Sequence, residues 1–315
     1  MDQINSVSET KQIKDYRSNS LWRLTLRRVF RQRSFIIGTI LLGILLFSAI
    51  FAPLIAPYPP DKVLIGVEDV SSREAPCIYL LGCSKEKSQH IMGINGNVRD
   101  QFSRIIFGTR VSLMIGFTTV GFAIVIGTFL GAVSGYFGGW LDNIIMRLMD
   151  VLMAFPSLLL SIAIVSVLGP GLQNALIAIG VVSIPIYARV VRASVLSVKE
   201  QTFVAASKAI GASHAHILLR RILPNATPPL IVQATLGIGT AILDAAALSF
   251  LGLGAQPPTP EWGTMLGTER NQVFTAPHLV FYPGFAIMIT VLAFNLLGDG
   301  LRDAIDPRLH QENKE

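Results

Sequence analysis

The chain has 315 residues, of which 51% are hydrophobic and 15% charged, and its mean hydropathy is +0.54. This composition is too apolar for an ordinary soluble domain of that length and indicates an all-α, polytopic membrane protein. The formal net charge of +6 lies mainly in the amino-terminal segment and in the connections between apolar segments. Anionic lipid headgroups attract such charge, so it does not indicate nucleic-acid binding.

Residues 1–34 form a basic leader ahead of the first apolar segment. Its cationic side chains are Lys11, Lys14, Arg17, Arg23, Arg27, Arg28, Arg31 and Arg33. Between Trp22 and Arg33, apolar residues share one helical face and arginines recur every fourth residue on the neighbouring face. This pattern favours an interfacial helix over a disordered basic tail. Basic segments beside a span stay in the cytoplasm, so the amino terminus is predicted to be cytoplasmic.

Six windows of about 20 residues contain almost no charge, which is the length that a helix needs to cross a hydrocarbon core of about 30 Å. The predicted spans are Phe35–Ile55, Val111–Ala132, Met149–Leu168, Leu172–Arg192, Leu230–Leu251 and Tyr282–Leu297. From a cytoplasmic amino terminus, six crossings place the connection 193–229 and the carboxyl terminus in the cytoplasm. The basic residues of that connection agree with this orientation. The long segment 57–107 is then extracytoplasmic.

The two cysteines, Cys77 and Cys83, fall in the predicted extracytoplasmic segment. Without further ligands nearby, they are too few for a metal site. An oxidising compartment permits a disulfide between them. Sequence spacing does not establish the geometry of that bond, so a disulfide and two free thiols are both open.

A polar stretch, Glu200–Ser213, interrupts the apolar sequence and is followed by Arg220–Asn225. Its small residues favour a helix with little side-chain bulk, and Gly211 supplies either a close approach or a left-handed helix stop. The stretch resembles the cytoplasmic coupling motif of ABC-importer permeases, "E-A-A, three residues, Gly, nine residues, I-x-L-P". Ala205 stands at the acidic position of the motif, and Arg221 stands at its isoleucine.

That resemblance implies a helix that docks on an ATPase subunit. The residues that it marks for this contact are Phe203, Ala205, Ala206, Ser207, Gly211, Ala212 and Pro224. The alternative is an ordinary loop helix between two spans. ATP-driven movement of the ATPase subunits would displace the helix at 200–213 and rock the attached spans.

Further motifs resemble dipeptide and oligopeptide permeases. Residues 93–104 and 108–113 are similar to the "G-x-D-x-x-G-R-D-x-x-S-R … G-x-R-x-S-L" pattern before the second span, with Asn95 at the aspartate and Val98 at the second glycine. Segments 135–142, 150–157, 248–263 and 298–308 belong to the same resemblance, which covers roughly residues 35–308. It identifies a C-type permease subunit with the type I ABC importer permease fold.

The resemblance implies the following organisation. A first transmembrane helix (35–56) and an extracytoplasmic loop (57–107) follow the leader, and the permease domain (108–304) with its coupling segment 193–229 precedes a cytoplasmic tail (305–315). The implied partners are a second homologous permease subunit, two cytoplasmic ATP-binding subunits and an extracytoplasmic solute-binding protein. The implied location is the bacterial plasma (inner) membrane.

No catalytic or cofactor motif is present. The sequence lacks the phosphate-binding G-x-x-x-x-G-K-[ST] loop, H-E-x-x-H and C-x-x-C. No cofactor or metal is therefore predicted. The chain is expected to be a transport subunit rather than an enzyme, with ATP hydrolysis on partner chains.

Three polar residues within predicted spans are candidates for the transport pathway: Asp244, Gln233 and Asn295. A carboxylate at membrane depth is costly unless it is paired, protonated or in contact with water, so Asp244 lines a pathway or braces two helices. For Gln233 and Asn295, hydrogen bonds between helices are the favoured interpretation.

Two other protein classes share the general pattern. A secondary transporter driven by ions is expected to carry more buried ionisable residues than Asp244, and internal repeats, neither of which is evident. In a multi-span receptor or structural membrane protein, the coupling-like segment would be a coincidence. The cargo stays open, because peptide, nickel and glutathione importers share these motifs.

Overall fold

The computed structural model describes residues 29–30, 32–84 and 86–305. The predicted interfacial helix within 1–34 and most of the predicted tail 305–315 fall outside these residues. The described chain is mostly helical, and its main irregular part is the segment 57–100. Its main helices are α3 (Arg33–Ile50), α4 (Ala52–Ile55), α5 (Gln101–Phe137), α6 (Gly139–Met153), α7 (Ser157–Leu168), α8 (Leu172–Lys199), α9 (Thr202–Ala209), α10 (His214–His216), α11 (Leu223–Phe250), α12 (Trp262–Glu269) and α13 (His278–Ile305). A π-helical turn, Ile217–Ile222, joins α10 to α11, and short 3₁₀ turns lie at Tyr79–Leu81 and Arg270–Gln272.

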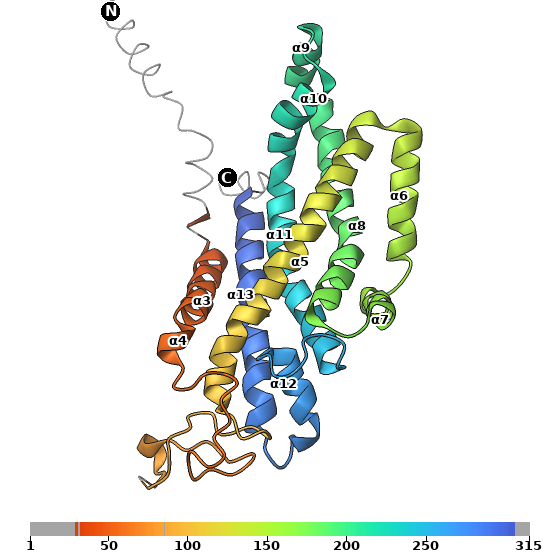
Figure 1. Ribbon diagram of the computed structural model, residues 1–315. Helices are drawn as coiled ribbons and strands as arrows, with labels where there is room; N and C mark the ends of the chain where they lie inside the picture. The colour runs from red at the N-terminus through yellow and green to blue at the C-terminus, as the bar shows by residue number, and fades with distance from the viewer. Residues whose placement is uncertain (1–28, 31, 85, 306–315) are drawn as a thin grey trace, which may run out of the picture.

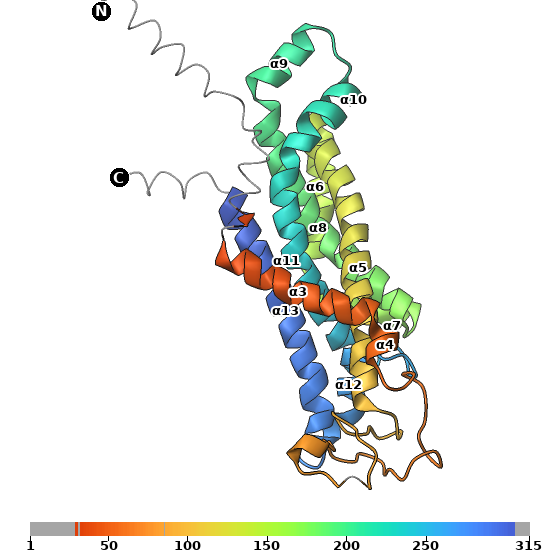
Figure 2. The same ribbon diagram turned by 90° about the vertical axis from the view of Figure 1, so that its left-hand side faces the viewer.

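The helices form an elongated bundle with two distinct ends (Figures 1 and 2). One end carries α9 and α10 and is called the α9 end here. The opposite end carries α12 and the segment 57–100, and is called the α12 end. Within the described residues, five helical runs are long and apolar enough to span a bilayer: α3, α5, α8, the run His214–Phe250, and α13.

The predicted third span, Met149–Leu168, is not one continuous helix. Instead α6 ends at Met153 and α7 begins at Ser157, with an angle of 89° between the two. Pro156 explains the break, because proline lacks the N–H that a helix needs and disfavours a helical conformation at the preceding Phe155. The described chain has six spans if this bent pair counts as one.

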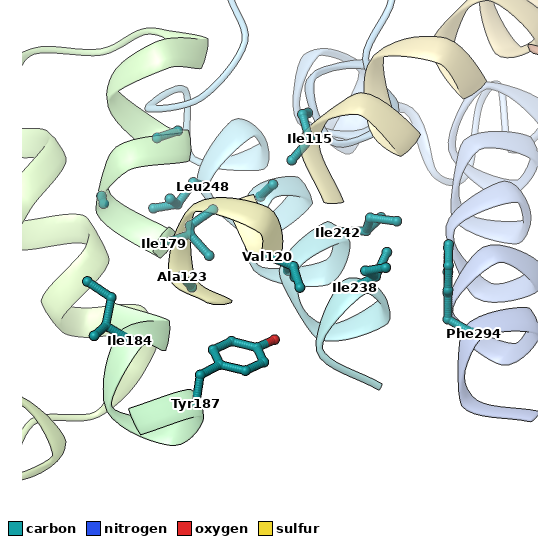
Figure 3. Close-up of a cluster of buried hydrophobic side chains, with 14 of the residues drawn as sticks. Ile115, Val120, Ala123, Ile179, Ile184, Tyr187, Ile238, Ile242, Leu248 and Phe294 are labelled. Carbon is teal, nitrogen blue, oxygen red and sulfur yellow. The ribbon is translucent and has the colours of Figure 1, made fainter. Parts of the chain in front are cut away.

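The centre of the bundle is a layer of apolar side chains from α5, α8, α11 and α13 (Figure 3). The side chains labelled there are Ile115, Val120, Ala123, Ile179, Ile184, Tyr187, Ile238, Ile242, Leu248 and Phe294. Helices α5 and α8 approach closely at Gly127, where an added Cβ would lie 2.7 Å from the Cβ of Tyr187. Any larger residue at Gly127 would force these two helices apart.

Helix α3 lies against the second half of α13 through two glycine contacts. A Cβ at Gly38 would lie 2.7 Å from the backbone nitrogen of Leu297, and a Cβ at Gly300 would lie 2.6 Å from the Cβ of Phe35. Small residues of this kind let helix backbones approach closely within a membrane. The first span is thereby fixed to the last one.

Segment 57–100 is held at the α12 end by hydrogen bonds between residues far apart in sequence. The Ser103 hydroxyl accepts a bond from the backbone N–H of Tyr58, and the guanidinium of Arg73 pairs with Glu269 at 3.0 Å. Cys77 and Cys83 form a disulfide, with Cα atoms 5.4 Å apart. Of the two alternatives open from sequence, the structure has the disulfide.

Candidate functional site

Helix α9 stands at the tip of the α9 end, beyond the long helices α8 and α11 (Figures 1 and 2). It begins after an extended Gln201 and stops at Ile210 and Gly211, whose φ is +81°. An added Cβ at Gly211 would have open space around it. Gly211 is therefore a left-handed helix stop and not a point of close approach within this chain.

The two faces of α9 differ in size and polarity. Helices α9 and α10, between the end of α8 and the start of α11, form a helical hairpin. Val204 and Ser207 are buried against the base of this hairpin, and the Ser207 hydroxyl donates to the carbonyl of Phe203 at 2.8 Å. Ala205, Ala206 and Ala209 are exposed on the opposite side. The side of α9 opposite Val204 and Ser207 is thus a ridge of alanines with the exposed Thr202 and Lys208 beside it, and another backbone can come close over the alanines.

The other residues of the predicted coupling set are dispersed around this ridge. Phe203 is 36% exposed, and Gly211 and Pro224 are also exposed, whereas Ala212 is half-buried. Sequence reasoning missed Ile210, which is 82% exposed next to Gly211. Its signal in the sequence was an isoleucine at the end of a run of small residues, and in the structure none of the described residues covers it.

Polar contacts tie the base of the α9 segment to α5 and α6. The hydroxyl of Tyr136 and Nδ1 of His214 lie 2.8 Å apart, and the ammonium of Lys199 donates to the carbonyl of Gly135 at 2.9 Å. About two turns earlier on α8, Arg192 donates two hydrogen bonds to Asp142, each of 2.6 Å. A displacement of α9 would therefore be passed to α5 and α6 as well as to α8.

A groove of about 480 Å³ lies between α6 and α8. Its charged lining comprises Asp142, Arg147, Asp150 and Arg192. Asp150 also pairs with Arg189, and both side chains are about half-exposed. Exposed charges on helices of a membrane protein need water or a partner chain. Sequence reasoning did not single out these residues, although segments 135–142 and 150–157 contain two of them, Asp142 and Asp150.

The three pathway candidates do not converge on one point. Gln233 and Asp244 are half-buried on α11 and eleven residues apart, so three helical turns place them on one face about 16 Å apart. Asn295 is exposed on α13, and its Oδ1 would lie 3.6 Å from a Cβ at Gly239. Gly239 is on a different side of α11 from Asp244, so Asn295 is separate from the other two.

At the α12 end, a buried imidazole joins two carboxylates. His90 is 3% exposed, with Nδ1 2.8 Å from Asp100 and Nε2 3.2 Å from Glu68. Burial alone would lower the pKa of His90, but the hydrogen bonds and charges of Asp100 and Glu68 outweigh it and raise that pKa. Burial also opposes ionisation of Glu68, yet its hydrogen bonds, first that from Tyr58, lower the pKa of Glu68.

These features define a multi-pass membrane protein with a slim helical hairpin at one end and a tightly bonded loop at the other. A family model described as "Binding-protein-dependent transport system inner membrane component" matches residues 123–311, and one described as "N-terminal TM domain of oligopeptide transport permease C" matches residues 20–76. The chain belongs to the family of binding-protein-dependent transport system inner membrane components.

Individual relatives agree with this assignment. The chain is 47% identical to the dipeptide transport system permease protein DppC of Alkalihalophilus pseudofirmus, over 93% of this chain and 92% of the relative. It is 45% identical to the glutathione transport system permease protein GsiD of Escherichia coli, over 91% of each chain. A chain in a solved structure of the MetNI methionine ABC transporter, in an inward facing conformation, has a TM-score of 0.54 at 22% identity, covering 64% of this chain and 97% of that one.

The fold is therefore that of an ABC importer permease, as the sequence predicted. The chain is a transport subunit rather than an enzyme, and the ATPase activity of such a system lies in separate subunits. In general, an importer of this kind combines a partner permease, ATP-binding subunits and a binding protein.

Proposed function

We propose that the chain is the C-type permease subunit of an importer for di- or oligopeptides and forms half of its translocation pathway. The dipeptide permease at 47% identity supports a peptide cargo. The glutathione permease at 45% identity makes glutathione, itself a small peptide, the alternative cargo. Uptake of a labelled dipeptide, measured with and without unlabelled glutathione, distinguishes the two cargoes. At low concentration, glutathione should inhibit this uptake only if glutathione is itself a cargo.

We further propose that the α9 end is cytoplasmic and receives an ATP-binding subunit, with the α12 end on the opposite side of the inner membrane. The basic leader and the basic residues near α9 support this orientation. In a background lacking Cys77 and Cys83, a cysteine at Ser72 should react with an impermeant reagent from outside, and one at Ser213 only after permeabilisation. Reaction of both from outside would contradict the orientation.

The observation that carries the coupling role is the exposed alanine ridge of α9, with Val204 and Ser207 buried beneath it. Added volume and an unpaired charge at a closely packed interface are both strongly unfavourable. Ala206→Arg should therefore insert normally in the membrane but fail to co-purify with the ATP-binding subunits, or bind them without substrate-stimulated ATP hydrolysis.

Ala75→Arg provides the matched control, because it makes the same change at an exposed alanine of the α12 end. It should leave the binding of the ATP-binding subunits unchanged. Normal assembly and stimulated ATP hydrolysis in Ala206→Arg would refute the coupling role of α9.

For the pathway, we propose that Asp244 faces the route of the cargo, with Gln233 on the same face of α11. The half-buried position of Asp244 on the central helix supports this role. Asp244→Asn should reduce transport while the assembled complex keeps its abundance. Loss of assembly instead would identify an interhelical brace.

A further inference from the structure

A small polar cavity at the α12 end lies between the start of α5 and helix α12. Its volume is about 20 Å³, and its polar lining includes Arg99, Gln101, Arg104, Thr264, Thr268 and Glu269. One water-sized sphere needs about 10–15 Å³ on this scale. The cavity therefore has room for one small ion or the head of one carboxylate group, and not for an amino acid.

Two guanidinium groups on the wall of this cavity have donors that nothing in the described chain accepts. Arg104 is only 5% exposed, and its Nη1 donates to the carbonyls of Pro60 at 2.9 Å and Pro258 at 3.2 Å. Its Nε is buried without a hydrogen-bond partner, and so is the Nε of Arg99. A buried donor on a charged group is costly to leave unpaired.

The charges around the cavity do not cancel among the residues that the structure describes. Glu269 is on the wall, but its Oε2 accepts from Arg73 at 3.0 Å and its Oε1 accepts from the backbone N–H of Gly96 at 2.9 Å. Its charge is therefore already matched by Arg73. Asp61 interacts with Arg104 over a distance, but it is exposed, so solvent and salt screen it. A net positive charge is left at the buried Arg104 and the half-buried Arg99.

The hydrogen bonds from Nη1 of Arg104 to the carbonyls of Pro60 and Pro258 satisfy the Nη1 donor. The bond to Pro60 also holds the 57–100 segment to α5. These bonds do not account for the two free Nε donors or for the like charges of two arginines on one small cavity. A water molecule in the cavity would not neutralise either charge. An anion would do so, and guanidinium groups suit carboxylates and other small anions.

We propose that this cavity is a binding site for one small monovalent anion, either chloride or a single carboxylate group, held between Arg99 and Arg104. The bound anion neutralises the two guanidinium groups. Because Arg104 bonds Pro60 and Pro258 and the cavity is walled by α12, occupancy also ties the 57–100 segment, α5 and α12 together.

Equilibrium binding of radioactive chloride to the assembled complex in nanodiscs tests the site. The buffer contains a bulky organic sulfonate as its anion, which the cavity cannot hold. The wild-type complex should bind about one more chloride per copy of this chain than the Arg104→Gln complex. Arg99→Gln should weaken binding at least about ten-fold.

Arg110→Gln is the matched control. Arg110 lies on the same helix α5, is exposed, and donates to the carbonyls of Ala49 and Ile50 away from the cavity. Its replacement should leave chloride binding at the wild-type level. Equal chloride binding by the wild type, Arg99→Gln and Arg104→Gln would overturn the proposal.

A second measurement covers the case in which Arg104→Gln fails to assemble. Crystals of the wild-type complex soaked in bromide should show an anomalous peak between the two guanidinium groups. Absence of this peak at a bromide concentration that displaces bound chloride would also overturn the proposal.

Displacement experiments then identify the source of the anion, and this arm rests on the proposed peptide cargo. A peptide with a free carboxyl terminus, but not its amide, should displace chloride if the carboxylate of the cargo uses the site. Displacement by acetate but by neither peptide assigns the site to free small anions. Since the chloride and bromide measurements use no peptide, they remain valid even if the cargo assignment fails.

Discussion

At the α12 end, polar side chains are buried and bonded to one another, whereas at the α9 end they lie near the surface and the exposed helix face is made of alanines. Asp100 and Glu261 are 3% and 1% exposed. Ser213 and His214, which form comparable hydrogen bonds near α9, are exposed. The α12 end therefore draws its order from its own side chains, while the α9 end presents surface that none of the described residues covers.

This difference predicts where substitutions will destabilise the chain itself. A buried polar group loses most when one partner is removed, because the other remains desolvated. An exposed group is solvated again at little cost. Substitutions at the α12 end should thus open the structure locally, and substitutions at the α9 end should mainly alter assembly.

The largest effect is expected for Asp100→Ala. Asp100 bonds Nδ1 of His90 at 2.8 Å and caps α5 by accepting from the backbone N–H of Ser103 at 2.7 Å. Its removal leaves both groups buried without this partner, which should cost about 3 kcal/mol in the free energy of local opening. Trypsin cleavage within the 57–100 segment should accelerate about 100-fold, since 1.4 kcal/mol corresponds to a factor of ten.

The counterpart at the α9 end is Tyr136→Phe, which removes the contact with His214. Because this contact is near the surface, its loss should cost less than about 1 kcal/mol in the local opening of the hairpin. Comparable losses for Asp100→Ala and Tyr136→Phe would show that the two ends do not differ as described.

A smaller effect is expected when the helix caps at the two ends are compared. Glu261 is buried and accepts from the backbone N–H groups of Gly263 and Thr264, both at 2.8 Å. Glu261→Ala should destabilise α12 by about 2 kcal/mol. Ser213 accepts from the N–H of His216 at 3.3 Å in an exposed position, so Ser213→Ala should cost only about 0.5 kcal/mol.

Hydrogen exchange of the α12 and α10 backbone amides, followed by mass spectrometry, reports each cap separately. Exchange in α12 should accelerate clearly in Glu261→Ala, while exchange in α10 changes little in Ser213→Ala. The reverse order would place the rigid part of the molecule at the α9 end.

The sequence predicted those parts of the fold that depend on local apolarity. Long uncharged windows located α3, α5, α8, α11 and α13, because a helix in lipid satisfies its own backbone and needs only apolar side chains. The same windows missed the break between α6 and α7, since the predicted span Met149–Leu168 is mostly apolar across the break, with Asp150 as its one charged residue. Pro156 was the only local signal, and hydropathy does not register it.

The α12 end could not be predicted in the same way. Glu68, His90 and Asp100 are separated by up to 32 residues of loop, and their contacts depend on how this loop folds over α5. For α9 the motif located the helix, but it did not say which residues face outward. Burial of Ser207 and exposure of Ile210 follow from the position of the hairpin relative to α8 and α11.

The smallest expected effect is a pH dependence that only the α12 end should show. The pKa of His90 is raised in the folded protein, so the stability that protonated His90 contributes is complete below its unfolded pKa of about 6.5 and is lost as the pH rises through the folded value. The pKa of Glu68 is lowered, so its contribution is present above its ordinary pKa of 4.5 and is lost in more acidic solution.

Opening of the 57–100 segment should therefore be slowest between these limits and accelerate as the pH rises above the folded pKa of His90. The rate of trypsin cleavage, corrected for the activity of trypsin on an unfolded peptide at each pH, measures this. His90→Gln should abolish the alkaline acceleration, because glutamine keeps polar contacts but does not titrate. His214→Gln, at the exposed imidazole of the α9 end, should retain it. An acceleration that persists in His90→Gln would mean that a group other than the buried imidazole controls the order of the α12 end.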